Sequence, residues 1–178
     1  TGATGLTGNA LLGAKTASGS STTIVALTTN WVLNHENAYA SGGIFKTLSA
    51  AGSVLYGSYG AYSSLNLTGC ADIDTGALAR GVAAGVAVYL LADIGEDLAV
   101  GATRIKVGAT IRAKFTVGEY VQIIDKDTIT IPGADATLPT INKHEIRRII
   151  AKAGSYIYIE QPLFFAHLRA SCGIERIA

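Results

Sequence analysis

Short runs of alternating apolar and polar residues between positions 102 and 167 constrain the fold of this chain more than any other feature. In the last of these runs, Ile157 and Ile159 alternate with Tyr158 and Glu160. A period of two is that of a β-strand with one buried and one solvated face. The runs end at Gly, Pro or Asp, which favour turns. Several short strands of this kind predict a mainly β fold, in the form of an antiparallel β-barrel or sandwich.

The alternation also predicts which side chains point into the core. The residues expected at its centre are Val121, Ile123, Ile157 and Ile159. Tyr158 and Glu160 should lie on the opposite face, and Arg147 and Arg148 should point to opposite faces of their own strand. We further expect the tail at residues 173–178 to dock as an edge strand.

The same runs carry a resemblance. A short strand is followed by Phe-x-Val-Gly-Glu-x-Val-x-Ile, by a Glu-x-x-x-Ile strand, and by a strand that ends in Pro-Leu with a histidine shortly after it. This order resembles a small β-module of structural proteins in tailed-phage virions, including head decoration and tail or fibre components. The matching residues, in roughly the last third of the chain, are Phe115, Val117, Gly118, Glu119, Val121, Ile123, Glu145, Ile149, Pro162, Leu163 and His167.

The resemblance implies a non-enzymatic virion subunit, most specifically a capsid decoration (cement) protein on the capsid surface that stabilises the head lattice. Its expected partners are the major capsid protein or other virion subunits, and further copies of the chain in a homo-oligomer. Residues 79–92 resemble the Gly-Val-Ala…Val-Tyr-Leu segment of head decoration proteins. The alternatives are a tail-tube, tail-tip or fibre subunit, and a filament or adhesin subunit at an extracellular cell surface.

Charge is distributed unevenly along the 178 residues. Residues 1–92 contain six charged side chains and 14 of the 21 glycines, and the other 21 charged side chains follow. This division predicts a flexible N-terminal arm at 1–21, a small-residue-rich β lobe at 22–98, and a compact antiparallel β-module at 99–178. The arm is expected to clamp neighbouring capsid subunits.

Net charge and hydropathy exclude two classes of partner. A net charge of +1 argues against a nucleic-acid-binding protein, which usually carries a strong basic excess. The longest apolar run, residues 82–92, is too short for a membrane span of about 20 residues. Its sequence favours a buried strand over the alternative of a short buried helix. The mean hydropathy of +0.35 favours a subunit that buries much of its surface against neighbours, and the alternative is a large, well-covered core.

The opening sequence at residues 1–8 matches the Thr-Gly-x-x-Gly-x-x-Gly turn of short-chain dehydrogenases. That turn needs a strand before it and a helix after it. Gly13 and Gly19 interrupt the residues that follow, and no Tyr-x-x-x-Lys occurs to supply a catalytic pair. We therefore expect no dinucleotide cofactor and interpret these residues as part of the arm.

Three groups of polar residues are candidates for metal or catalytic sites. Adjacent His35 and Glu36 point to opposite faces of an extended chain, and a solvated turn is the better interpretation. Asp72 and Asp74 supply too few oxygen ligands for calcium, so no metal is expected there. The remaining histidines, His144 and His167, are expected to be polar surface or interface residues.

The two cysteines, Cys70 and Cys172, are far apart in the sequence and lack metal-binding spacing. Buried free thiols are the favoured interpretation, and a disulfide remains the alternative.

Residues 38–67 are rich in Gly, Ser, Ala and Tyr, which predicts an irregular surface with tyrosines available for contacts. Residues 22–33 before them are β-branched and apolar and predict a strand. Aromatic residues are favoured at interfaces. The candidate interface residues are Trp31, Tyr56, Tyr59, Tyr62 and Tyr158.

Overall fold

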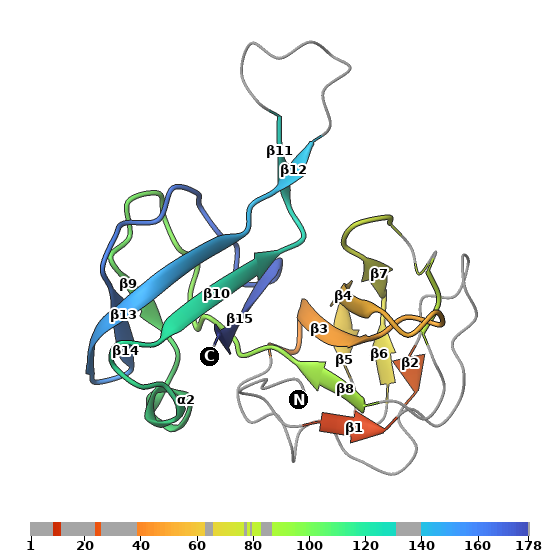
Figure 1. Cartoon of the computed structure of the whole chain (residues 1–178), viewed down its shortest axis with the longest axis horizontal. Coiled ribbons are helices and arrows are strands. Elements are labelled where there is room, and N and C mark those ends of the chain that lie inside the picture. The colour runs from red at the N-terminus through yellow and green to blue at the C-terminus, as the bar shows by residue number, and fades with distance from the viewer. Residues whose placement is uncertain are drawn as a thin grey trace.

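The computed structural model is mainly β with antiparallel strand pairing, which confirms the predicted fold class (Figure 1). The residues that it describes are 9–11, 24–25, 39–62, 66–76, 78, 80–82, 87–130 and 140–177. Most of the expected arm, the pair at 35–36 and Trp31 therefore lie outside the described residues. Of the strand expected at 22–33, Ile24–Val25 is described, and it is extended.

The first lobe contains a five-stranded sheet and a three-stranded sheet. In spatial order, the five strands are β1 (Asn9–Leu11), β8 (Ala87–Leu90), β3 (Gly43–Leu48), β4 (Val54–Tyr59) and β7 (Ala71–Asp72). The smaller sheet consists of β2 (Ile24–Val25), β6 (Asn66–Thr68) and β5 (Ala61–Tyr62). Within the apolar run at 82–92, residues 87–90 form strand β8, as expected, while residues 83–86 lie outside the described part of the chain.

The expectation of an irregular surface at 38–67 was wrong, because β3 and β4 form a regular hairpin there. Its glycines lie directly across the hairpin from aromatic residues, Gly57 from Phe45 and Gly43 from Tyr59. A Cβ at Gly57 would come within 2.2 Å of the Phe45 ring. The glycines therefore provide space in which the two rings lie over the neighbouring strand.

The second lobe contains another five-stranded sheet, together with a short helix and a hairpin. In spatial order, its strands are β15 (Cys172–Ile177), β10 (Tyr120–Asp125), β13 (Glu145–Ala153), β14 (Tyr156–Ile159) and β9 (Arg104–Lys106). Helix α2 (Ala109–Lys114) buries Ile111 in the core of this lobe. The hairpin of β11 (Thr128–Ile129) and β12 (Ile141–Asn142) projects away from both lobes (Figure 1).

The predicted register of the second lobe is confirmed. The expected core residues Val121, Ile123, Ile157 and Ile159 are all buried in one apolar cluster. Glu160 is exposed and Tyr158 half-buried, while Arg147 is buried and Arg148 exposed. The tail forms β15 at the edge of the sheet, as expected.

The two lobes are joined through β15. Ile174 exchanges two backbone hydrogen bonds of 3.0 Å with Ala92, which follows β8. Ile44 and Leu91 of the first lobe pack with Ile124 of the second. Gly173 lies so close that a Cβ there would be 2.7 Å from the Leu91 Cβ. Among the described residues, no helix is long and apolar enough to cross a membrane.

Candidate functional site

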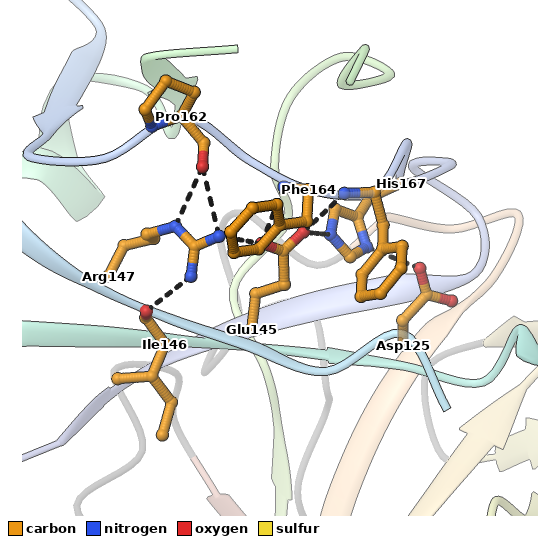
Figure 2. A network of polar contacts seen from close by, with 8 residues as sticks. Asp125, Glu145, Ile146, Arg147, Pro162, Phe164 and His167 are labelled. Atoms are coloured by element: carbon orange, nitrogen blue, oxygen red, sulfur yellow. Dashed lines mark hydrogen bonds and ion pairs between the residues drawn. The ribbon is translucent and has the colours of Figure 1, made fainter. Parts of the chain in front are cut away.

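The second lobe buries a chain of ionisable side chains in the order Asp125, His167, Glu145 and Arg147 (Figure 2). Asp125 is the last residue of β10, and Glu145 is the first residue of β13. His167 belongs to the segment after β14 and is held by two backbone hydrogen bonds of 2.9 Å with Leu98. We call these four residues the buried network.

Both ring nitrogens of His167 face carboxylate oxygens. Nδ1 lies 2.6 Å from Oδ2 of Asp125, and Nε2 lies 3.0 Å from Oε1 of Glu145. An ionised carboxylate only accepts hydrogen bonds, so if both carboxylates are ionised, both ring nitrogens donate and the ring is an imidazolium cation. Two cations, His167 and Arg147, then balance two anions. Such balance and pairing are what burial of charges requires.

Glu145 has no oxygen left for a further ligand. Besides His167, its Oε1 accepts the backbone N–H of Phe165 at 2.9 Å. Its Oε2 accepts the backbone N–H of Phe164 at 2.9 Å and a hydrogen bond from Arg147. Four donors use the approximately four acceptor positions of a carboxylate. The hydrogen bonds of this carboxylate therefore hold the segment after β14 in place.

Arg147 completes the same attachment. Its Nε and Nη2 atoms donate to the carbonyl oxygen of Pro162 at 3.2 and 3.1 Å, and Nη1 donates to that of Ile146 at 2.8 Å. The guanidinium lies 5.1 Å from the centre of the Phe164 ring, close enough for a cation–π contact. The buried network thus ties β10 and β13 to residues 162–167.

The expectation that His167 is a surface or interface residue was wrong, since its side chain is 0% exposed. Its partners lie 42 and 22 residues away in the sequence, and nothing in the sequence pairs them. His144, for which the same expectation was stated, is exposed as expected, and its Nε2 lies 3.1 Å from the backbone oxygen of Asp125.

Asp125, His167 and Cys172 form a candidate metal cluster, with ligand atoms within 4.8 Å of one another. A metal at about 2.0–2.2 Å from nitrogen and oxygen ligands in tetrahedral geometry separates those atoms by about 3.3 Å. The 2.6 Å between His167 and Asp125 is a hydrogen-bond distance instead. Burial, followed by the negative charge of Asp125, raises the pKa of the Cys172 thiol well above its usual value and disfavours the thiolate that metals need. The cluster does not fit a metal.

The carboxylate pair at Asp72 and Asp74 is engaged by Arg80. Nη2 of Arg80 lies 2.7 Å from Asp72 and 2.8 Å from Asp74, and its Nε also donates to Asp72. Burial by itself would raise the pKa of Asp72, but the hydrogen bonds from Arg80 and the backbone N–H of Asp74 outweigh it and lower this pKa. The pair is a structural ion-pair site within the first lobe.

The candidate interface tyrosines differ in exposure. Tyr59 is 1% exposed and packs edge-to-face with Tyr62 at 6.1 Å, so it belongs to the core of the first lobe. Tyr56 is half-buried and donates a hydrogen bond to Glu175 across the boundary between the lobes. Tyr62 and Tyr158 are half-buried, and an interface role for them stays a prediction.

The cysteines agree with the favoured interpretation. Cys70 lies in the core of the first lobe and Cys172 in that of the second, and no disulfide joins them.

Fold and site together define a mainly β protein whose second lobe contains a buried network of hydrogen-bonded ionisable residues. No family model matches the chain, and no curated protein matches it. Among solved structures, it is similar to part of the tailspike gp61 of Pseudomonas phage phi297, with 14% identity and a TM-score of 0.37. The match covers 47% of this chain and 13% of the tailspike chain. Similarity at this level carries no inference about function.

Proposed function

We propose that this chain is a non-enzymatic structural subunit of a tailed-phage virion, with capsid decoration as its specific role. The observation that carries the proposal is the saturation of the buried network. A catalytic base or nucleophile needs a free lone pair or a transferable proton within reach of a substrate. The side chains of His167 and Glu145 instead bond to each other, and Glu145 also accepts hydrogen bonds from backbone N–H groups. Both residues are buried away from solvent.

The residues that carry the phage-module resemblance support an architectural role. Phe115, Val121, Ile123, Ile149 and Leu163 all lie in the apolar cluster of the second lobe. The glutamate and histidine of the same pattern, Glu145 and His167, are hydrogen-bonded partners. The pattern thus consists of residues that build one module, which is the property expected of a structural subunit.

The proposed partners are the major capsid protein and further copies of the chain, with no nucleic acid or membrane. Binding through buried apolar area requires neither a cofactor nor a metal. The net charge of +1 supports the exclusion of nucleic acid from this set.

Immunogold electron microscopy of particles from the producing culture tests this function. Antibodies against the chain should label virion heads in a regular array. Labelled tails or fibres would replace the decoration role by the tail alternative, and labelled cell-surface filaments would favour the adhesin alternative. Particles without label would overturn the virion assignment.

A further inference from the structure

The edges of the sheet in the second lobe are poorly suited to adding a strand from a neighbour. At one edge, β9 is three residues long and contains two cations, Arg104 and Lys106. At the other edge, β15 is already paired with Ala92 on its outer side. Short, charged or covered edges resist edge-to-edge association. A neighbour is therefore more favourably bound through a face of this sheet.

The face that points away from the core is partly apolar and open. Tyr120 of β10 is 49% exposed, and Ile146 and Ile150 of β13 are 52% and 50% exposed. Tyr120 pairs directly with Arg148, which lies between the two isoleucines on the same face. We call these four residues the outer face.

The outer face continues a surface that is already covered within the molecule. On β10, Ile124 shares this side of the sheet with Tyr120, and it packs against Ile44 and Leu91 of the first lobe. The opposite end of the same surface has no covering segment among the described residues. One sheet face thus extends from a buried lobe boundary, past the half-buried Gln122, to exposed apolar side chains.

The charges at the outer face are self-complementary. Arg148 of β13 lies 4.0 Å from Glu160, and both side chains are about half exposed. An exposed pair at this distance contributes little within one chain, so both groups remain available to a partner. A two-fold axis between them would place each Arg148 over Glu160 of a second copy and bring the isoleucines of both copies into contact.

Extending the structural role proposed above, we propose that the outer face is where two copies of this chain associate. The contact is isologous, with isoleucines of both copies at its centre and two reciprocal pairs of Arg148 and Glu160. Interfaces of this kind take their binding energy from buried apolar side chains and their register from charge pairs.

Charge reversal combined with mixing tests this inference by sedimentation velocity. The variants Arg148→Glu and Glu160→Arg should each weaken self-association of the full chain about tenfold or more, because each symmetric contact would then contain two like-charged pairs. An equimolar mixture of the two variants should restore association, because every contact between unlike chains is again complementary. Restoration on mixing is possible only if the charges meet between molecules.

The matched control is the exposed ion pair of Lys106 and Glu96, which lies at the β9 edge with its charges 3.7 Å apart. Lys106→Glu and Glu96→Arg should leave association unchanged. If the single reversals have no effect, or if the mixture stays dissociated, the outer face is not the contact between copies. Either result would leave the proposed function intact. A parent chain that stays monomeric at high concentration would overturn self-association through any surface, while the labelling of virions tests the proposed function independently.

Discussion

The Nδ1 atom of His167 lies 2.6 Å from the Oδ2 atom of Asp125, although the two residues are 42 positions apart in the sequence. Glu145 approaches the opposite nitrogen of the same ring at 3.0 Å. A fully buried imidazole ring thus connects the end of β10 to the start of β13. The first prediction follows from this arrangement.

We expect His167→Phe to lower the free energy of unfolding by about 3–5 kcal/mol, because two buried carboxylates then lose their shared hydrogen-bonding partner. Urea denaturation monitored by circular dichroism measures the change. The matched control is His144→Phe, which replaces an exposed histidine and should cost at most about 1 kcal/mol. Equal stability of the two variants would show that His167 does not hold the buried network together.

The register of β14 predicts a large loss of stability on substitution at Ile159 and almost none at Glu160, which follows the strand. Ile159→Asp places an unpaired carboxylate in the core and removes apolar contacts, a loss of several kcal/mol against a total stability of about 5–15 kcal/mol. Glu160→Ala changes an exposed side chain and should leave the thermal melt nearly unchanged. The reverse order of melting temperatures would require exchanging the two faces of the strand.

Asp72 predicts a contribution to stability that depends on acid pH. Its pKa is lower in the folded chain than the ordinary value of 3.8, so the folded state holds the ionised form more strongly than the unfolded state does. The resulting stabilisation is complete above pH 3.8 and is lost as the pH falls through the lower folded pKa. Asp72→Asn should therefore flatten the dependence of stability on pH below about pH 4. Unfolding curves with the same acid dependence as the parent would contradict the ion pair with Arg80.

Cysteine reactivity is predicted to be low in the native chain. Cys172 is buried, and its raised pKa keeps the thiol protonated at neutral pH. A chromogenic disulfide reagent should react slowly at pH 8 and should titrate both thiols once denaturant is added. If the native chain reacts rapidly, the variant Cys172→Ser shows which thiol is responsible. A rapid reaction that disappears in this variant would contradict the prediction.

The sequence was least informative where side chains pack over distant backbone. The glycines at 43 and 57 indicated irregular chain, yet each lies opposite an aromatic ring that needs the space of a missing Cβ. Composition predicts how flexible a segment is, but it does not identify which aromatic ring lies across the hairpin from a glycine. The same limit applies to Tyr59, which was expected at an interface and is buried beside Tyr62.

By itself, the sequence determined the β class and the inward face of the second lobe. The reason is that side chains of a strand alternate between its faces, so Val121, Ile123, Ile157 and Ile159 reveal the core without knowledge of their partners. The tertiary structure alone decided the buried network. His167 alone gives no local sign of its partners, and both of its ring nitrogens are hydrogen-bonded only because β10, β13 and the segment after β14 bring two carboxylates to the same ring.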